Sequence, residues 1–347
     1  MRDGRAGGGG GLAACAPTGR AAGVRGMAQA ARALWIVAPG QVELRPVAVE
    51  PRPDDVVVDT LYTGISRGTE RLVFEGRVPE SEHATMRAPF QEGAFPAPVK
   101  YGYCAVGRVS TGDRAGQVVF VLHPHQTRFA CPAQMAVPVP DCVPPARAVL
   151  AANMETALNI LWDAQVAPGD RGAVIGAGTV GALVGYLAAR VPGTDVTLID
   201  RDGARAALAE AFGCRFAQPE AAQGDADVVI HATASPAGLG TAIRIAGIEA
   251  RVVEASWYGS GEIGVALGGA FHQRRLQIIS SQVGRIPASH AARWDYRRRM
   301  EVALRLLADP VLDRLISGET RFDDLPRDYP AILAAADTLC HRVRYGA

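Results

Sequence analysis

The feature that most constrains this sequence is a glycine-rich turn set between a short apolar run and an amphipathic helix. The apolar run 173–175 predicts a strand that leads directly into Gly176-Ala-Gly-Thr-Val-Gly181. After the turn, apolar residues recur at the spacing of one helix face: Val180, Leu183, Val184 and Leu187. A second apolar run, 196–199, ends at Asp200. This order of strand, turn, helix and strand predicts the first unit of a doubly wound parallel sheet.

The spacing of the glycines indicates a site for a dinucleotide. Gly176 permits the tight turn, Gly178 lets the backbone approach a pyrophosphate, and Gly181 lets the helix pack closely on the strand. The helix N terminus offers free N–H groups and partial positive charge to the pyrophosphate, so Thr179 and Val180 join the predicted cofactor-binding residues. A glycine turn without a ligand is the alternative, which the flanking strand, helix and acid disfavour.

The acid at the end of the second strand favours NAD over NADP. Asp200 stands where an acid accepts both ribose hydroxyls of NAD, and its charge repels the additional phosphate of NADP. Arg201 follows immediately and offsets part of that repulsion. The sequence therefore predicts NAD as the cofactor and leaves NADP as the less favoured alternative.

The chain of 347 residues favours two domains. Residues 33–142 contain β-branched runs separated by frequent turn residues, which predicts a small β-barrel-like domain. From residue 143 the pattern changes to alternating strands and helices, with strands expected at 173–175, 196–199, 214–217, 228–231, 251–255 and 277–280. The expected division is a disordered extension over 1–26, a β domain over 27–150 that 291–347 completes, and a dinucleotide-binding domain over 151–290.

Composition and charge disfavour several classes of function. With 48% hydrophobic residues, 20% charged residues and a formal net charge of +1, the chain has no overall field to attract nucleic acid or an anionic membrane. It has no apolar run long enough for a transmembrane helix and no secretory signal, and its cysteines form no C-x-x-C pair. We therefore expect a cytoplasmic protein with reduced thiols, whose partner is a small-molecule substrate.

The combination of a β domain, a dinucleotide-binding domain and a C-terminal return resembles the medium-chain dehydrogenases/reductases, alcohol dehydrogenase-like proteins with a GroES-like domain. The resemblance spans residues 33–346. It implies an α/β fold with a Rossmann sheet and a GroES-like β-barrel, and a nicotinamide in the cleft between them. It also implies that Thr233, Ser256 and Trp257 contact the cofactor, although core packing is the alternative for Trp257. It leaves the oligomeric state open, with a homodimer among the options.

The positions where zinc-dependent members carry metal ligands differ in this chain. In Thr63–Glu70, Ser66 replaces a cysteine, and in Gly102-Tyr-Cys-Ala-Val-Gly107, Tyr103 replaces a histidine. Ala152 matches the third ligand, and the four-cysteine structural zinc lobe is missing. Hydroxyl and methyl groups are poor replacements for thiolate, imidazole and carboxylate, so the resemblance points to a zinc-free member with no metal site.

Part of the same stretch narrows the resemblance. The motif Gly64-Ile-Ser-x-Gly-Thr-Glu70 is similar to the zinc-lacking branch that includes the dehydrogenase of bacteriochlorophyllide hydroxyethyl groups. Because the motif is short, it supports the branch and not that substrate.

Reduction of a carbonyl builds negative charge on oxygen, and some group must stabilise or protonate it. We hypothesise that Tyr103 acts as acid/base, helped by Ser66 and by Lys100, the only lysine in the chain. On a regular strand Lys100 and Tyr103 would point to opposite faces, so their cooperation requires Gly102 to break the strand, and a chance lysine is the alternative. Glu155 is a further candidate, either for substrate binding or as part of a solvated helix face.

Three other features have two interpretations each. His123, His125 and Cys131 could form a metal site, but surface histidines are more common. The run Arg297–Arg299 could bind an anionic substrate, but a solvated helix face is more common. The long segment 79–98 is either a lid or a surface loop.

The sequence favours a zinc-independent NAD(H)-dependent oxidoreductase that acts on an alcohol/carbonyl pair. A quinone or enoyl reductase and a non-catalytic dinucleotide-binding sensor are the alternatives. The sequence names neither the substrate nor the direction of the reaction.

Overall fold

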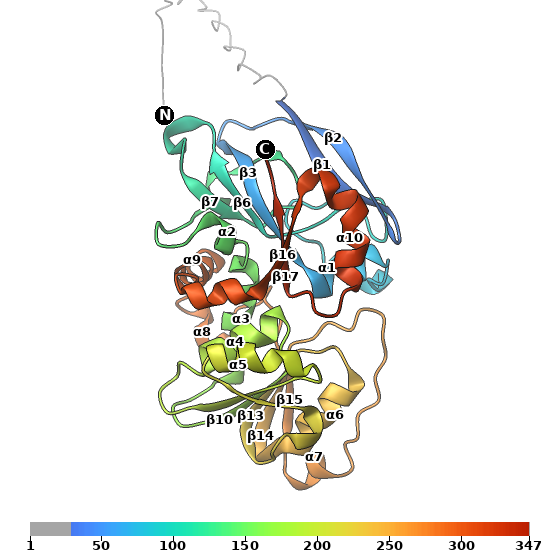
Figure 1. The fold of residues 1–347 in the computed structure, drawn as a ribbon, viewed down its shortest axis with the longest axis vertical. Coiled ribbons are helices and arrows are strands. Elements are labelled where there is room, and N and C mark those ends of the chain that lie inside the picture. The colour runs from blue at the N-terminus through green and yellow to red at the C-terminus, as the bar shows by residue number, and fades with distance from the viewer. Residues whose placement is uncertain (1–28, 347) are drawn as a thin grey trace, which may run out of the picture.

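The computed structural model describes residues 29–346. The extension expected over 1–26 lies outside the described residues. Figure 1 shows two parts stacked along the long axis, an upper part rich in antiparallel strands and a lower part built on a parallel sheet. The predicted fold class is confirmed.

The lower part is a six-stranded parallel sheet, here called the Rossmann sheet, in the order β12-β11-β10-β13-β14-β15. Its strands are β10 (Arg171–Ile175), β11 (Asp195–Ile199), β12 (Arg215–Ala217), β13 (Ala226–His231), β14 (Ala246–Glu254) and β15 (Gln277–Ser280). Each predicted strand is present, with ends shifted by a few residues. The chain enters at β10, moves outward to β12 and then returns to β13 on the other side of β10. The boundary between β10 and β13 is therefore the point where the winding reverses, which is where ligands bind in such sheets.

Helices accompany the Rossmann sheet. They are α3 (Ala151–Ala164), α4 (Thr179–Ala188), α5 (Ala206–Ala211), α6 (Pro236–Ile245), α7 (Ala270–Gln273), α8 (Ala288–Ala291) and α9 (Tyr296–Leu306). Before α3 comes the short helix α2 (Pro145–Ala148). Between them the Leu150 N–H donates to the Arg147 carbonyl at 3.0 Å, which is a tighter turn than an α-helix makes.

The upper part, here called the β part, contains two sheets in the orders β2-β1-β5-β4 and β16-β17-β3-β6-β7-β9, with β8 paired to β3. The N-terminal strands are β1 (Gln29–Ala38), β2 (Gln41–Val49), β3 (Asp55–Ser66), β4 (Glu92–Gly93), β5 (Val99–Lys100), β6 (Ala105–Val109), β7 (Val118–Val121), β8 (Arg128–Pro132) and β9 (Val137–Pro138). The C-terminal strands β16 (Ile316–Arg321) and β17 (Cys340–Arg344) join them, because β17 pairs antiparallel with β3 (Figure 1).

Two helices complete the β part, α1 (Arg67–Phe74) and α10 (Leu325–Ala334). Segment 79–98 is anchored to this part rather than extended into solvent. Its β4 pairs with β5, and Phe95 is buried in the same hydrophobic cluster as Tyr101.

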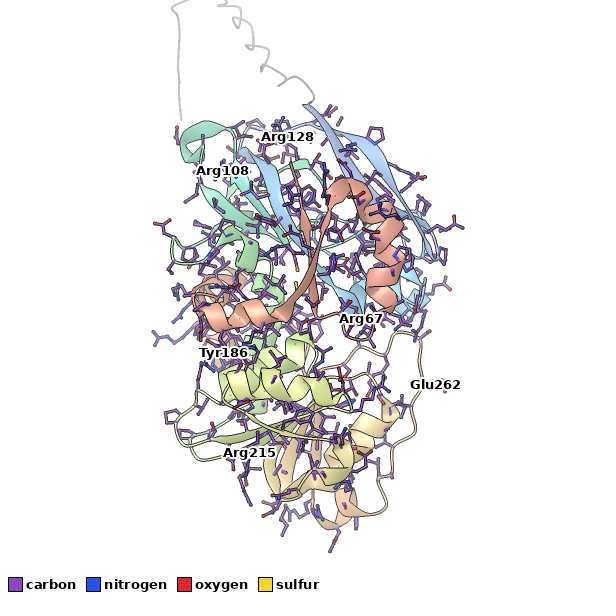
Figure 2. All side chains as sticks on the ribbon, in the orientation of Figure 1. Arg67, Arg108, Arg128, Tyr186, Arg215 and Glu262 are labelled. Carbon is purple, nitrogen blue, oxygen red and sulfur yellow. The ribbon has the colours of Figure 1, made fainter. Side chains whose placement is uncertain are left out.

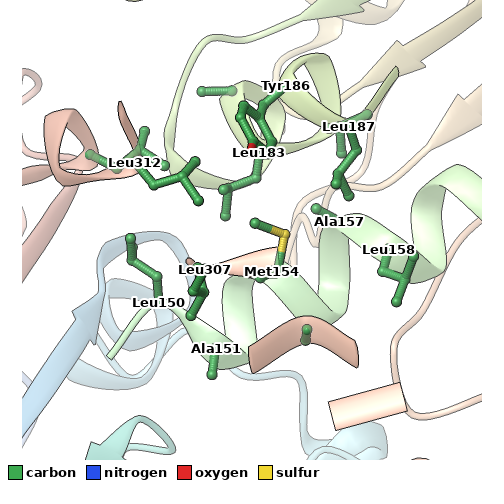
Figure 3. Close-up of a cluster of buried hydrophobic side chains, with 14 of the residues drawn as sticks. Leu150, Ala151, Met154, Ala157, Leu158, Leu183, Tyr186, Leu187, Leu307 and Leu312 are labelled. Atoms are coloured by element: carbon green, nitrogen blue, oxygen red, sulfur yellow. The ribbon is translucent and has the colours of Figure 1, made fainter. Parts of the chain in front are cut away.

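The largest hydrophobic cluster runs across both parts. Figure 3 shows its centre, where α3 packs against α4 and against the segment after α9. The residues labelled there are Leu150, Ala151, Met154, Ala157, Leu158, Leu183, Tyr186, Leu187, Leu307 and Leu312. Because cluster members also come from β6 and β7, the two parts share one core and hold a fixed relation to each other.

Polar contacts also lie near the junction of the two parts. Figure 2 labels Tyr186 and Arg67 near the junction of the two parts. The Tyr186 hydroxyl donates to Asp309 at 2.9 Å, and the Arg67 guanidinium donates to the Leu333 carbonyl at 3.1 Å.

No helix between residues 29 and 346 combines the length and the apolar character that crossing a membrane requires. The cysteines of the described residues, Cys104, Cys131, Cys142, Cys214 and Cys340, are unpaired.

Candidate functional site

The glycine-rich turn sits at the carboxyl end of β10, at the reversal point of the Rossmann sheet. Gly176 has a φ of +101°, which disfavours any side chain, and a Cβ there would lie 2.6 Å from Thr233 Cγ2. A Cβ on Gly181 would lie 1.9 Å from the Gly176 carbonyl oxygen. Both positions therefore require glycine for the turn and for close packing of α4 on the sheet, as the sequence predicted.

Gly178 serves a different purpose. It is exposed, it precedes the first residue of α4, and a Cβ built on it would meet nothing within 4 Å. Space is therefore open directly over the turn. The N–H groups of Thr179 and Val180 lie in the first turn of α4, at the end of a helix where anions bind. This cradle fits a pyrophosphate.

Asp200 lies at the rim of the cradle. One carboxylate oxygen accepts from the Ala177 N–H at 2.8 Å and the other from the Asp202 N–H at 2.9 Å. Two backbone donors fix the orientation of the carboxylate and leave further lone pairs for a ribose diol. Arg201 is exposed beside it. The arrangement fits the adenosine half of a dinucleotide.

A polar cluster that the sequence analysis missed occupies the carboxyl ends of β13 and β14. His231 ends β13, Glu254 ends β14, and the two residues are register partners. His231 Nδ1 lies 2.7 Å from Glu254 Oε2, and His231 Nε2 lies 2.5 Å from the Thr233 hydroxyl. The Tyr258 hydroxyl also donates to Glu254 at 2.9 Å. Ser256 also belongs to the cluster, since its N–H donates to Glu254 at 2.8 Å.

The predicted cofactor residues of this edge divide into two groups. Thr233 is exposed beside Gly176, and the Ser256 hydroxyl accepts from the Ala234 N–H at 3.0 Å, so both lie along the sheet edge. Trp257 instead packs against the hydrophobic cluster of the β part that contains Tyr101 and Tyr329. The packing alternative thus accounts for the Trp257 ring, which ties the loop after β14 to the other half of the molecule.

Ser66 and Tyr103, predicted to act together, are neighbours. The Ser66 hydroxyl hydrogen-bonds the Tyr103 side chain, and the Asn153 amide donates to Ser66 Oγ at 3.2 Å. Ala152, the match to the third zinc ligand, precedes Asn153 on α3. The three positions that differ from zinc-dependent enzymes therefore converge where β3, the segment before β6, and α3 meet.

Burial reinforces the protonated form of Tyr103, which its ordinary pKa already favours near neutrality. It raises the pKa of the Tyr103 hydroxyl well above its ordinary value, and the hydrogen bond from Ser66 opposes that rise only in part. Tyr103 therefore remains protonated near neutrality. Ser66 Oγ accepts from Asn153, so the Ser66 proton is available to Tyr103, and the Tyr103 O–H can then donate to another acceptor.

A buried hydrogen-bond network holds the backbone of Ser66 in place. Glu70 is fully buried and accepts from the Ser66 N–H at 2.7 Å and from the Tyr329 hydroxyl at 2.7 Å. His125 lies 3.0 Å from Glu70 and 2.6 Å from the Thr63 hydroxyl. Because Tyr329 belongs to α10, this network joins the start of α1 to the C-terminal return.

The structure does not bring Lys100 to Tyr103. Gly102 has a φ of +127° and does break the strand, as cooperation would require. The Lys100 ammonium nevertheless bonds Glu92 at 2.5 Å and Gln126 at 2.7 Å, inside the β part. Both of these hydrogen bonds hold the segment before Tyr103 in place, and the hypothesis that Lys100 assists catalysis stays a prediction.

Glu155 is buried, so the alternative of a solvated helix face is wrong for it, while a role in substrate binding stays a prediction. It faces Arg299 of α9, whose guanidinium donates to Glu155 at 3.0 Å, to Asn159 at 2.5 Å and to the Val283 carbonyl at 2.6 Å. Arg299 is 2% exposed, so the expectation of a solvated charge run holds for its neighbours and is wrong for this residue. Burial raises the pKa of Glu155, and Arg299 opposes that rise.

The candidate metal residues have other partners. His123 stacks on Phe129 with ring centroids 3.8 Å apart, and His125 belongs to the Glu70 network. No group of three or more His, Cys, Asp or Glu side chains that could hold a metal ion occurs within residues 29–346.

Comparison with known proteins agrees with this geometry. The ketopantoate reductase PanE/ApbA family matches residues 173–244, which include the glycine turn and Asp200. The 2-desacetyl-2-hydroxyethyl bacteriochlorophyllide A dehydrogenase of Cereibacter sphaeroides is 39% identical over 77 residues, which is 21% of this chain and 21% of that protein. The match thus spans about a fifth of the length of that relative.

Solved structures match almost the whole chain. A zinc-binding dehydrogenase from Sinorhizobium meliloti bound to NADP has a TM-score of 0.73 at 21% identity, and the match covers 91% of this chain and 99% of that one. The 2R,3R-butanediol dehydrogenase of Bacillus subtilis has a TM-score of 0.73 at 17% identity, with 90% and 99% covered. A structure described as a short chain alcohol dehydrogenase from E. coli, complexed with NADH, has a TM-score of 0.71 at 18% identity, with 92% and 99% covered. The chain has the medium-chain dehydrogenase/reductase fold, a Rossmann sheet with a GroES-like domain.

Proposed function

We propose that this chain is a zinc-independent, NAD(H)-dependent oxidoreductase that transfers a hydride between a nicotinamide and an alcohol or carbonyl substrate. The observation that carries the proposal is the cradle at the reversal point of the Rossmann sheet. There Gly178 leaves the space over the α4 N terminus open, and Asp200 lies at the rim. The fold shared with alcohol and butanediol dehydrogenases supports the same reaction class.

The donor chain at Tyr103 suits a carbonyl substrate. A bound nicotinamide supplies the hydride chemistry, and the protein must stabilise the charge that develops on the substrate oxygen. Asn153 orients Ser66, and Ser66 orients Tyr103, whose protonated hydroxyl donates to that oxygen. This narrows the sequence hypothesis from acid/base to hydrogen-bond donation, because a raised pKa disfavours ionisation of Tyr103.

The side chains at the three matching positions support the proposal of zinc independence. Ser66, Tyr103 and Ala152 offer two hydroxyls, already hydrogen-bonded to each other, and a methyl group. Zinc in proteins prefers thiolate, imidazole and carboxylate ligands. We therefore propose that the Ser66–Tyr103 pair takes over the task of polarising the substrate oxygen.

The test is hydride transfer by metal-depleted protein. Protein treated with a chelator should reduce ketones with NADH and oxidise the matching secondary alcohols with NAD, followed by nicotinamide absorbance. Acetophenone and 1-phenylethanol serve as a simple acetyl/hydroxyethyl pair within a wider panel. We expect the same rate before and after chelation. Activity that is lost on chelation and restored by zinc would contradict zinc independence, and NADH binding without turnover would favour a sensor.

Cofactor preference tests the role of Asp200 separately. We expect NADH to bind more tightly than NADPH in a titration followed by nicotinamide fluorescence, because the Asp200 carboxylate attracts the ribose diol and repels a phosphate. Asp200→Ala should bring the two affinities to within about threefold, because it removes both the attraction and the repulsion. For scale, a tenfold preference corresponds to about 1.4 kcal/mol. Asp202→Ala, which removes a neighbouring carboxylate, is the matched control and should keep the preference. Equal affinities in the unmodified protein would mean that Arg201 outweighs Asp200.

A further inference from the structure

A second concave site lies in the β part, separate from the cofactor cradle. It is a cavity of about 310 Å³, which is at the lower end of the range for small-molecule sites. Arg344, which lines it, stands opposite Tyr62 of β3, four residues before Ser66. The cavity therefore lies about 13 Å along the strand from Ser66. None of the described residues that line it belongs to the glycine-rich turn or to the Ser66–Tyr103 pair.

Three arginines line this cavity, here called the arginine pocket: Arg32, Arg321 and Arg344. Arg321 and Arg344 are register partners on the neighbouring strands β16 and β17 (Figure 1). Their side chains therefore project from the same face of the sheet, and like charges at such opposed positions repel each other. An anion bound between them replaces this repulsion by attraction.

Two of the three arginines have acidic partners, but these partners leave most of the N–H donors free. Arg32 donates to Asp323 through one nitrogen at 2.5 Å. Arg344 lies 3.4 Å from one oxygen of Glu319, whose other oxygen binds Arg342 at 2.6 Å. Since a guanidinium carries five N–H donors, both arginines of the pocket can bind a further anion.

Arg321 has no partner of its own among the described residues. It is exposed, and it makes no hydrogen bond or ion pair within residues 29–346. The three guanidinium groups of the lining, set against the single carboxylate of Asp323, leave a net charge of +2. Inclusion of the Arg342–Glu319 pair leaves that value unchanged. The charge of the pocket therefore matches a dianion.

Two buried aromatic rings fix the backbone from which the paired arginines project. The rings belong to Phe322 and Tyr345, the residues that directly follow those two arginines. They stack with centroids 4.7 Å apart and are 3% and 8% exposed. The Tyr345 hydroxyl lies 3.1 Å from the Thr63 hydroxyl in the interior. The two arginines are thus attached to a packed part of the molecule, which lowers the cost of ordering them around a ligand.

We propose that the arginine pocket binds a phosphate dianion, either free phosphate or the monoester of a small molecule, between Arg321 and Arg344. A phosphate monoester carries nearly two negative charges at neutral pH and presents three acceptor oxygens. Guanidinium groups bind such oxygens in pairs, which suits two arginines that lie side by side. This ligand is additional to the cofactor and to the substrate of the hydride transfer, because the pocket shares no lining residue with the cradle or with the Ser66–Tyr103 pair.

The first test is calorimetric titration of the full chain with phenyl phosphate, with and without saturating NADH. We expect one binding site for which NADH does not compete. Arg321→Gln and Arg344→Gln should each weaken binding about tenfold or more, since each removes charge-assisted hydrogen bonds to the phosphate. Arg171→Gln removes an equal charge from an exposed arginine at the start of β10. It is the matched control and should keep the affinity within about twofold.

Two further probes define the ligand. Benzoate has the same ring and a single charge, so it should bind about tenfold more weakly than phenyl phosphate or not at all. Inorganic phosphate distinguishes the two sources of the dianion. An affinity equal to that of phenyl phosphate identifies free phosphate as sufficient, and a weaker one identifies a monoester. Benzoate that binds as tightly as phenyl phosphate would contradict the assignment of a dianion.

The second test measures the stability of the ligand-free protein. Because Arg321 repels Arg344 and has no partner within residues 29–346, Arg321→Gln should leave the free energy of unfolding unchanged or raise it slightly. Phenyl phosphate should raise the unfolding temperature of the unmodified protein and raise that of the variant much less. A clear loss of stability in ligand-free Arg321→Gln would assign the residue to the fold instead of to a ligand.

Three results of the titration would overturn the proposal. The first is absence of binding. The second is displacement of phenyl phosphate by NADH, which would place the anion in the cradle. The third is equal weakening in Arg171→Gln, which would mean diffuse attraction to surface charge. None of these results bears on hydride transfer, which the arginine pocket does not require.

Discussion

Replacement of Tyr103 by phenylalanine is expected to slow hydride transfer about hundredfold and to leave NADH affinity within about twofold, the loss typical of a missing donor at a developing oxyanion. The substitution removes one oxygen and keeps the ring, which packs against the hydrophobic clusters of both halves of the molecule. Only the end of the Asn153–Ser66–Tyr103 donor chain is lost. The measurement is single-turnover reduction of a ketone by NADH.

Tyr101 provides the matched control for this experiment. Its ring meets that of Tyr103 edge to face, with centroids 6.0 Å apart, and it is buried in the same region. Tyr101→Phe removes a hydroxyl that has no bond to Ser66, so turnover should stay within about threefold. Near-normal turnover in Tyr103→Phe would refute the donor role, and equal losses in both variants would assign the effect to packing.

Replacement of Arg299 by leucine is expected to destabilise the fold by about 3–5 kcal/mol, because it leaves the Glu155 carboxylate buried without its partner. The Arg299 and Glu155 side chains are 2% and 6% exposed. The free energy of unfolding, measured with denaturant, gives the loss. Arg298→Leu removes the neighbouring arginine, which is exposed and lies over the Trp294 ring, and should cost about 1 kcal/mol or less.

The loss in Arg299→Leu should depend on pH. Burial already raises the pKa of Glu155, and removal of Arg299 raises it further. An acid whose pKa is raised on folding costs stability as pH rises above its unfolded value, since the folded state then holds a proton that the unfolded state has lost. The penalty should therefore shrink toward acidic pH. It should also shrink in Arg299→Leu combined with Glu155→Leu, and a penalty unchanged in both experiments would argue against the unpaired charge as its cause.

Short-range patterns predicted the Rossmann sheet and its ligand-binding turn. Gly176, Gly181 and Asp200 belong to one continuous stretch, and each residue acts on neighbours within that stretch. Their spacing was therefore sufficient to predict the ligand-binding turn. The Ser66–Tyr103 pair was reached through resemblance, and the structure adds Asn153, which comes from a helix far along the chain.

The cluster around His231 was missed because it forms only when two parallel strands align. His231 and Glu254 lie 23 residues apart, with α6 between them. One signal was nevertheless present, since both residues lie at or next to the ends of runs that were predicted as strands, 228–231 and 251–255. Polar residues at such strand ends converge on the ligand edge.

Arg299 was misread because a run of three arginines resembles a solvated face. It adjoins Met300 and stands four residues before Ala303, two buried residues of the same helix. Helical spacing therefore places Arg299 on the buried face of α9, where it contacts Glu155 and Asn159 of α3. The partner of Lys100 was also missed, because Glu92 reaches it only after β4 pairs with β5.

The pairing of β17 with β3 has a consequence for how the molecule is made. The β part begins with strands near the N-terminal end, yet one partner of β3 is the last strand, β17. One partner of the buried Glu70 is Tyr329, near the same end. During synthesis the Rossmann sheet, whose strands are contiguous, can form while β3 still has an unpaired edge. The β part must wait for the last residues and close a loop of nearly the whole chain, which makes its assembly the slower, long-range event. The half of the molecule that carries Ser66 and Tyr103 is thus completed last, around a cofactor-binding half that can already be folded.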